Sequence, residues 1–556
     1  MNAKKVQSLA TQGLYAVTRY KPEKKPSKNN AQLIYASAAC LFVAYLQREL
    51  RDVVSINVDN ALMDSLCLII EGVKSVPNRP VEPRALGTSF GCSEYGLLDG
   101  VAHIMSVIFS DPKSVVYMSD SSKRNHRFLE GDSRNLFRIS LELLRDSDSK
   151  IELSPNGVQT LLRCAQQVLQ QEREQENSMN LFIEPIAPYS GQPQGSLTLI
   201  ALVCRHLGTD YLHELHDWPE SRGGGAVGVS AHLTIICQII TDSFRLANPN
   251  SAEDDAVVRD IQQILYKEKL MEMLVQALDY TEIAFWGTPF AIISKLVNSS
   301  QHFAKAFVDG GGLEPNRIQR VLDVKKSSTG LISDGLNVLS QLARLSKDFY
   351  PAIHGANLYD TFAVLFQQTE KEIRGKMCTL IGNLCKHSPY FYEPMSKYKL
   401  VDGLVNCCND KDAYTQKFSA FAVGNAAFHS DYLYADLKPS IPAILKLLSS
   451  SDDKTRQNAA GALSNFVRNG DQLVDKLVEY RAAEALLNML KNDKASLKSI
   501  IVITINSFCV YPVFRDKLVS SGLLQVIDEL ESDPSTCNDA TIKKYVGRIK
   551  DRINQG

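Results

Sequence analysis

Apolar residues recur at helical spacing from residue 31 onward, whereas the strict alternation typical of strands is nearly absent. In AQLIYASAACLFVAYLQREL, residues 31–50, one side of a helix collects Leu33, Ala36, Cys40, Val43 and Leu46 or Leu50. Clusters of Pro, Gly, Asp and Ser then separate further helices, which we predict near 60–74, 94–109, 134–145, 156–176, 195–215, 229–246 and 256–279. The pattern predicts an all-α chain with uneven loops.

A period appears in the C-terminal half. The segments GNLCKHSPYF, GNAAFHSDYL, SNFVRNGDQL and INSFCVYPVF align on an asparagine, and these asparagines follow one another at intervals of 42, 40 and 41 residues: Asn383, Asn425, Asn465 and Asn506. Two upstream segments, SQLARLSKDF and SKLVNSSQHF, place Gln341 and Lys295 in the same register. A period of about 40–47 residues is typical of armadillo and HEAT repeats.

Each unit has a charged opening, a long apolar helix and small residues where helices must approach closely, among them Gly375, Ala459, Ala460 and Gly461. One such helix pair cannot cover its own apolar face, so each unit must stack on its neighbours. We therefore predict an all-α, armadillo/HEAT-type right-handed α-solenoid. Its expected parts are a basic segment and linker at 1–30, irregular helical repeats at 31–285 and armadillo-like repeats at 286–548 with a period of about 41 residues.

Composition narrows the possible functions. The 61 basic and 62 acidic residues nearly cancel, which argues against a chain-wide nucleic-acid surface. The 12 cysteines show no paired CxxC spacing, which favours a reducing cytosolic compartment. We see no apolar stretch of the roughly 20 residues that a membrane span needs and no secretory signal. We expect protein partners, with no nucleic acid, no membrane and no small-molecule substrate.

From about residue 370 to 530, the units EIRGKMCTLIGNLCKHSPYFY, TQKFSAFAVGNAAFHSDYLY and NAAGALSNFVRNGDQLVDKLVEYRAAEALLNML closely resemble the C-terminal armadillo-like region of the Fused family of serine/threonine kinases. In that family a kinase domain precedes the repeats. The resemblance implies Hedgehog-type signalling, the central apparatus of motile cilia or, in plants, division-plane formation. It also implies kinesin-like or axonemal partners, tubulin, and a location in the cytoplasm, the cytoskeleton and the cilium or axoneme.

Kinase chemistry itself is not predicted for this chain. A kinase needs a Gly-rich phosphate loop, a strand lysine, a catalytic-loop Asp and a magnesium-binding Asp. Gly223, Gly225 and Gly228 fit GxGxxG, but no strand precedes them, so we interpret them as a flexible loop. The nearest approach to an HRD motif is His126-Arg127-Phe128, which lacks the acid. We predict no catalytic residue and no enzyme activity.

No cofactor or metal site is predicted either. Cys204, His206, His213 and His216 lie close together in the sequence, but their spacing is not a common zinc pattern, and we interpret them as a polar helix end. The adjacent Cys407 and Cys408 are interpreted as small apolar residues.

The asparagine series is the candidate partner groove. Asn383, Asn425, Asn465 and Asn506 would offer amide donors and acceptors to an extended peptide, or each would serve neighbouring carbonyls inside the stack. Three residues on stand Lys386, Phe428, Arg468 and Cys509, which makes the groove mildly basic and partly apolar. The tryptophan of importin-α-type proteins is replaced by Thr379, Phe421, Gly461 and Val502, so capture of basic peptides is not expected.

A second candidate surface lies in the N-terminal segment, where Lys21, Lys24, Lys25 and Lys28 stand beside Pro22 and Pro26. These lysines form either a solvated tail or a contact for an acidic surface, for which tubulin is the natural candidate under the resemblance.

Two functions follow. The first is a non-catalytic armadillo-repeat scaffold that mediates protein–protein interactions in microtubule-based structures such as the axonemal central apparatus. The alternative is the regulatory region of a Fused-type kinase whose catalytic domain is absent from this chain.

Overall fold

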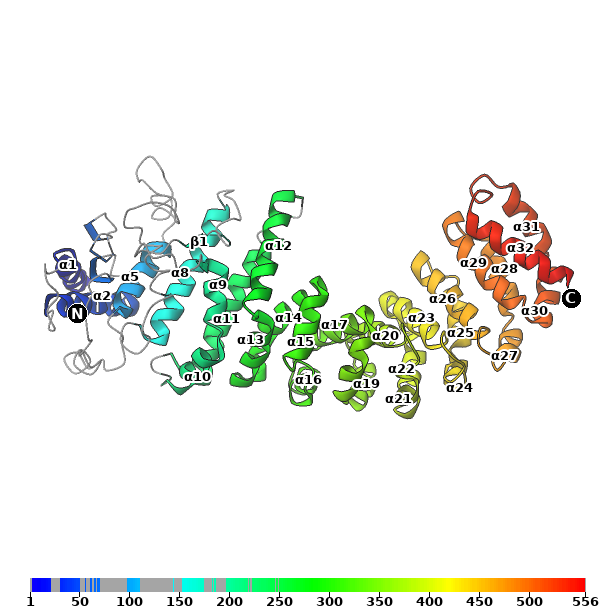
Figure 1. Ribbon diagram of the computed structural model, residues 1–556, viewed down its shortest axis with the longest axis horizontal. Coiled ribbons are helices and arrows are strands. Elements are labelled where there is room, and N and C mark those ends of the chain that lie inside the picture. Colours follow the sequence, from blue (N-terminus) through cyan, green and yellow to red (C-terminus); the bar gives the residue numbers. More distant parts are fainter. Residues whose placement is uncertain are drawn as a thin grey trace. The chain divides into compact units, whose positions relative to one another are not determined.

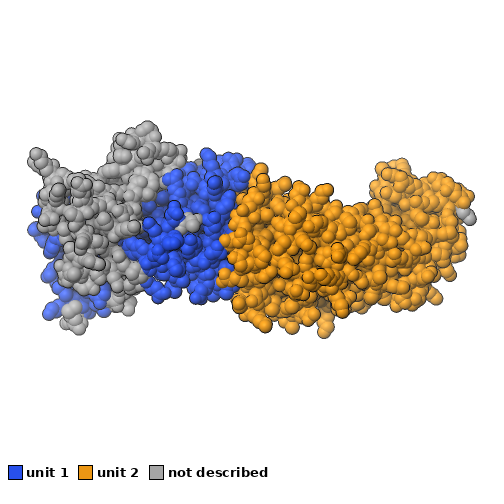
Figure 2. Space-filling view, turned by 60° about the horizontal axis from the view of Figure 1, so that its bottom comes forward, with its two compact units in different colours: residues 1–292 blue, residues 293–556 orange. Residues whose placement is uncertain are grey.

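The computed structural model describes residues 3–21, 31–50, 98–110, 153–174, 197–218, 223–245 and 250–555, together with shorter pieces at 56, 61–62, 65–66, 68–70, 144, 183, 185–186, 220 and 247–248. The chain divides into two compact units, residues 1–292 and 293–556, which Figure 2 colours separately. Each unit is described by itself below.

Unit 2 is a stack of long helices (Figure 1). Six of them repeat along the chain, and each packs against the next: α17 (Thr329–Leu345), α20 (Lys371–Leu384), α23 (Ala413–Ala426), α26 (Asp453–Phe466), α29 (Ala495–Phe508) and α32 (Ala540–Asn554). The helix α14 (Gly287–Ser299) crosses the boundary between the units.

Two shorter helices follow each long helix except the last. The first of each pair is α15 (Gln301–Asp309), α18 (Tyr350–Gly355), α21 (Tyr392–Lys397), α24 (Tyr434–Leu437), α27 (Val474–Glu479) or α30 (Pro512–Ser520). The second is α16 (Pro315–Val321), α19 (Tyr359–Phe366), α22 (Leu400–Cys407), α25 (Ile441–Leu447), α28 (Ala482–Asn492) or α31 (Leu523–Ser532). Three helices per period of about 41 residues is the armadillo arrangement.

Local chemistry sets where these helices begin. Asp412 and Asp452 cap α23 and α26, because their carboxylates accept hydrogen bonds from the backbone N–H groups of Thr415 and Thr455 at 2.9 and 2.8 Å. Between the two short helices the backbone turns through the left-handed region, with φ of 50° at Asn357, 54° at Lys399 and 53° at Arg481. This turn recurs in three repeats, whereas a 3-10 helix at Lys438–Ser440 joins α24 to α25 without it.

Two glycines of α20 lie directly against aromatic side chains of α23. A Cβ atom at Gly375 would lie 2.6 Å from the Tyr414 ring, and one at Gly382 would lie 2.5 Å from the Phe421 ring. These glycines therefore make room for the aromatic side chains of α23. Gly461 differs, because a Cβ atom there meets nothing within 4 Å. The expectation that Gly461 marks a close helix crossing is wrong, since the space beside it is open.

Unit 1 is also helical. Its packed series runs through α1 (Ala3–Thr18), α2 (Ala31–Glu49), α5 (Asp99–Ser110), α8 (Pro155–Glu174) and α11 (Gly225–Arg245). Four further helices, α9 (Leu199–Arg205), α10 (Thr209–Asp217), α12 (Ala252–Lys267) and α13 (Leu270–Ala277), pack around α11 or near it. Among the described residues the only strands are the two-residue pair β1 (Pro185–Ile186) and β2 (Leu197–Thr198), which run antiparallel.

One helix in unit 1, α11, is long and apolar enough to cross a membrane, which the sequence analysis did not anticipate. About two thirds of its most apolar window, 67%, is buried inside the protein. It also carries the buried polar residues His232, Asp242 and Ser243, each of which has a hydrogen-bond partner within the protein.

The prediction of an all-α solenoid is confirmed. The helix expected at 134–145 lies outside the described residues except for residue 144, and the one at 60–74 is described only in part. The helix predicted from 229 begins at Gly225.

Candidate functional site

The face formed by the long helices of unit 2, here called the long-helix face, contains the asparagine series. Three of the four amides donate to the preceding long helix: Asn383 Nδ2 to Ser340 Oγ, Asn425 Nδ2 to Gly382 O and Asn465 Nδ2 to Gly424 O, each at 2.8 Å. These bonds are made inside the stack. They support the second interpretation of the series, in which the amides join neighbouring helices, and they use donors that a bound peptide would otherwise need.

A tyrosine accompanies each of these three asparagines. Tyr350, Tyr392 and Tyr434 are buried, and their hydroxyls donate to the backbone carbonyls of Asn383, Asn425 and Asn465 in the next repeat, at 3.1 and 3.0 Å for the first two. Burial raises the pKa of Tyr350 to about 12, so its hydroxyl keeps its proton. Each hydroxyl also accepts from a backbone N–H four residues beyond the asparagine, at 3.2–3.4 Å.

The tyrosine series could have been found in the sequence, because each tyrosine stands nine residues after Gln341, Asn383 or Asn425. It lapses after Asn465, where Val474 occupies the position. There the carbonyl of Asn506 accepts instead from Arg552 of α32. Asn506 is buried, with 6% of its surface exposed, and its Oδ1 atom has no hydrogen-bond partner. The structure therefore keeps Asn506 inside the stack.

A third series covers the ends of the long helices, where carbonyl groups have no partner within the helix. His387 Nε2 lies 3.0 Å from the carbonyl oxygen of Arg344, and His429 Nε2 lies 3.2 Å from that of Lys386. In the next repeat Asn469 Nδ2 donates to the carbonyls of Ala427 and Phe428 at 3.1 and 3.0 Å. Successive helix ends are thus joined side by side.

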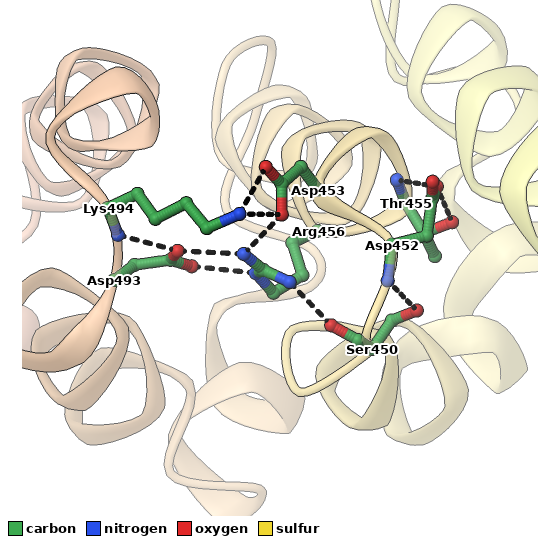
Figure 3. Close-up of polar contacts among 7 residues, drawn as sticks. All are labelled: Ser450, Asp452, Asp453, Thr455, Arg456, Asp493 and Lys494. Atoms are coloured by element: carbon green, nitrogen blue, oxygen red, sulfur yellow. Dashed lines mark hydrogen bonds and ion pairs between the residues drawn. The ribbon is translucent and has the colours of Figure 1, made fainter.

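At the opposite, N-terminal edge of the face, arginines clamp one repeat to the next (Figure 3). The guanidinium of Arg456 binds both carboxylate oxygens of Asp493, at 2.7 and 2.8 Å, and also donates to Ser450 O at 2.7 Å. Lys494 and Arg456 share Asp453. Arg374 and Asp410 repeat the arrangement, with N–O distances of 2.6 and 3.1 Å.

These clamps shift the titration of the acids. Burial is the largest single influence and raises the pKa of Asp493, but hydrogen bonds from Arg456 and from the Lys494 backbone, together with the positive charges of both residues, hold the pKa below its usual range. For Asp410, the hydrogen bonds from Arg374 are the largest cause of a lowered pKa. Both carboxylates are therefore ionised at neutral pH, and each is paired with an arginine of the N-terminal edge.

The C-terminal edge is different. Arg344, Lys386, Phe428 and Arg468 occupy the same position in four successive repeats and are all exposed; we call them the C-terminal row. Lys386 Nζ donates to the carbonyl of Arg344 at 3.2 Å, and the Arg468 guanidinium lies over the Phe428 ring at 4.1 Å. Cys509, the next member by sequence, is buried. The row offers three positive charges and one aromatic ring to a ligand.

The other sequence candidates do not form sites. Gly223 and Gly225 have φ of 83° and 67° and form the turn that enters α11, which begins at Gly225, so the prediction of a flexible loop is wrong for Gly225 and Gly228. The side-chain amide of Gln159 donates to the carbonyls of Gly223 and Gly228, each at 3.2 Å. The glycines therefore permit a helix entry against α8.

The cluster Cys204, His206, His213 and His216 is divided by the fold. Cys204 and His206 are buried, burial lowers the pKa of His206 to about 4, and His213 and His216 are exposed on α10. No group of metal ligands occurs among the described residues. Cys407 and Cys408 are both buried at the end of α22, as packed apolar residues are.

Of the four lysines proposed to contact an acidic surface, Lys21 is described and exposed, whereas Lys24, Lys25 and Lys28 lie outside the described residues. That contact stays a prediction.

Comparison with known proteins agrees with this architecture. A family model described as a HEAT-like repeat matches residues 413–466, which run from α23 through α26. An engineered protein of known crystal structure aligns over 83% of this chain and 96% of its own length, with a TM-score of 0.58 and 16% sequence identity. At this identity the match shows the fold alone, which is that of a helical-repeat solenoid.

The curated relatives are kinases. The chain is 32% identical to the serine/threonine-protein kinase TIO of Arabidopsis thaliana over 306 residues, which are 52% of this chain and 23% of that protein. It is 24% identical to serine/threonine-protein kinase 36 of Pongo abelii over 380 residues, 66% of this chain and 27% of that protein. The chain spans about a quarter of the length of these relatives. It is thus a repeat region related to Fused-type kinases, as the resemblance implied.

Proposed function

We propose that this chain is a non-catalytic scaffold that binds other proteins through the long-helix face of unit 2, with the C-terminal row as its contact surface. The observation that carries this proposal is that some side chains of that face bond within the stack while others remain exposed. The asparagines, the tyrosines and the arginines at the N-terminal edge form hydrogen bonds within the stack, whereas Arg344, Lys386, Phe428 and Arg468 remain exposed. A solenoid presents such a row as an extended binding surface.

The setting we propose is a microtubule-based structure in the cytoplasm and cytoskeleton, such as the axonemal central apparatus of a cilium, with kinesin-like or axonemal proteins and tubulin as partners. The similarity to Fused-type kinases supports this setting. The lysine-rich segment that contains Lys21 would add a weak, salt-dependent contact to an acidic surface such as tubulin.

Affinity isolation from ciliated cells tests the proposal. The full chain and its Phe428→Ala/Arg468→Ala variant are compared, with Lys446→Ala as a matched control, because Lys446 is exposed on α25, away from the row. We expect the parent and the control to recover axonemal proteins, and the double variant to recover less of them. Equal recovery by all three chains would place the contact elsewhere.

A second function is supported by the relatives, which are kinases about four times as long as the matched region. In this alternative the chain is the regulatory region of a Fused-type kinase and acts on a catalytic domain. Kinase assays with the separately expressed kinase domain of a relative test it. A change in phosphotransfer rate on adding this chain supports the alternative, and an unchanged rate argues against it.

A further inference from the structure

The positive charges of the long-helix face are distributed unevenly between its two edges. At the N-terminal edge, two lysines contact uncharged groups, Lys417 the rings of Tyr414 and Phe418 and Lys454 the Gln457 side chain. Five other cations have carboxylate partners: Arg374 with Asp410, Arg456 with Asp493, Lys494 with Asp453, Lys371 with Asp412 and Lys376 with Glu372. Arginines in this arrangement are neutralised within the protein. They therefore join neighbouring repeats and offer no unpaired charge to a ligand.

At the C-terminal edge the cations have no carboxylate partner among the described residues. The side chain of Arg344 donates to the amide oxygen of Gln341 at 2.9 Å, Lys386 to a backbone carbonyl, and Arg468 lies against an aromatic ring. All three contacts are to uncharged groups, so three exposed positive charges stand without a direct ion pair, although Asp348, Asp431 and Asp471 follow the row by three or four residues. The chain as a whole carries a formal charge of −1, which makes this row a local feature.

The row is also continuous. The Lys386 ammonium reaches the backbone of Arg344, His429 reaches the backbone of Lys386, and Arg468 covers Phe428. Packed helices lie about 8–10 Å apart, and an extended chain rises about 3.3 Å per residue. About three residues of an extended peptide therefore span one repeat, and about nine span the row from Arg344 to Arg468.

We infer that the C-terminal row binds an extended acidic segment of a partner protein, with carboxylates at about every third residue and an apolar side chain against Phe428. This inference rests on the proposed function and names the chemistry of the partner. Carboxylates would pair with Arg344, Lys386 and Arg468, and arginine can hold a carboxylate through two parallel hydrogen bonds. Phe428, with 37% of its surface exposed, supplies the apolar contact between the charges.

Fluorescence anisotropy with synthetic peptides and the full chain tests the inference. The probe is a labelled peptide of about twelve residues with Glu at every third position and one central Leu. The control peptide carries Gln in place of each Glu. We expect binding of the Glu peptide only, and weaker binding as the salt concentration rises, because screening shortens from about 30 Å at 0.01 M to about 8 Å at 0.15 M ionic strength.

Charge reversal locates the contact. Arg468→Glu and Lys386→Glu should each weaken the Glu peptide about tenfold, the size expected for losing and opposing one interfacial charge. Lys446→Glu makes the same change of charge on α25 and should leave affinity unchanged. Because all three side chains are exposed, each variant should melt at the temperature of the parent, and thermal melts check that the fold is retained.

Equal affinity for the Gln peptide, or loss of affinity with Lys446→Glu alone, would overturn the inference. So would an oligonucleotide that binds as tightly as the Glu peptide, since the row would then be a general anion surface. If partners isolated from cells still depend on Phe428 and Arg468 while the Glu peptide fails to bind, the acidic chemistry is wrong and the scaffold function stands. If the partners do not depend on these residues, the scaffold function fails at this face.

Discussion

The helices α23 and α26 occupy the same place in successive repeats and share the hydrogen bonds that join them to their neighbours. Each begins at an aspartate cap, and each sends an asparagine amide to a glycine carbonyl of the preceding helix. Some of the side chains that lie beside the preceding long helix differ. α23 carries Tyr414, Phe418 and Phe421, whereas the positions 40 residues later on α26 are Lys454, Asn458 and Gly461.

The comparison teaches which positions the fold requires. The aspartate caps and the asparagine amides are the same in both repeats, whereas Tyr414 and Phe421, which lie against glycines of α20, correspond to Lys454 and Gly461 on α26. The same caps and asparagine bonds can therefore join long helices whose remaining contacts are made by different side chains. The predictions below test this separation, beginning with the largest expected effect.

The first concerns the clamp at the start of α26. Asp493 has 7% of its side chain exposed and is held by Arg456. The residue of α23 that corresponds to Arg456 is Gln416, which donates only to the carbonyl of Asp410. Arg456→Ala leaves a nearly buried carboxylate without its partner and should cost about 3 kcal/mol in the free energy of unfolding. Gln416→Ala should cost about 1 kcal/mol. Urea unfolding of both variants measures the difference.

The pH dependence of the clamp provides its control. The folded pKa of Asp493 is lowered, so its contribution to stability is present above the unfolded pKa of about 3.9 and is lost as the pH falls through the folded pKa. The difference between the parent and Arg456→Ala should therefore shrink below about pH 4. A difference that stays constant down to pH 3 would show that Arg456 acts through packing rather than charge.

The second prediction uses the glycines. Gly382→Ala places a Cβ atom 2.5 Å from the Phe421 ring and 3.2 Å from the backbone of Ala422, so it should destabilise by about 1–3 kcal/mol. Gly461→Ala meets nothing within 4 Å and should stabilise by about 0.5–1 kcal/mol, because alanine favours the helix interior. Unfolding midpoints should move in opposite directions.

A double-mutant cycle shows whether the ring is the cause. If Phe421 is the obstacle, Gly382→Ala should cost much less in a Phe421→Ala background. An unchanged cost would mean that the backbone contact to Ala422 dominates and that the aromatic side of α23 is not what requires the glycine.

The third and smallest effect concerns the shared tyrosines. Tyr434→Phe removes the hydroxyl that donates to the carbonyl of Asn465 and accepts from the N–H of Asn469, and should cost about 1 kcal/mol. Tyr432→Phe is the matched control, since Tyr432 is 56% exposed and should be neutral. Equal melting temperatures for both variants would show that the buried tyrosine hydroxyl does not stabilise the stack.

Much of this architecture follows from the sequence. The 3.6-residue spacing of apolar residues and the interval of about 41 residues define the helices and their stacking, because burial of one face per helix is what the repeat must achieve. The position of the row containing Lys386, Phe428 and Arg468 also follows, since it lies at a fixed distance from the asparagines.

The use of each side chain does not follow from spacing alone. The sequence leaves open whether Asn425 faces a ligand or a neighbouring helix, and the 2.8 Å contact to Gly382 supports the neighbouring helix. Gly375 and Gly461 are both small residues inside a long helix, at different positions of the repeat. Spacing alone does not show that one lies under Tyr414 and the other beside open space, because the contact depends on a residue some 40 positions away. Pairing of Arg456 with Asp493 depends on the stack in the same way.

The most direct test compares two double variants of the full chain in the same melting and peptide-binding experiments. Asn425→Ala/Asn465→Ala removes two bonds of the stack, and Phe428→Ala/Arg468→Ala removes two members of the C-terminal row. The account predicts that the first variant melts at a lower temperature and binds the Glu peptide with unchanged affinity per folded molecule. It predicts that the second melts like the parent and loses affinity. An asparagine variant that keeps the parent's melting temperature and loses affinity would contradict the account and return the asparagines to the binding site.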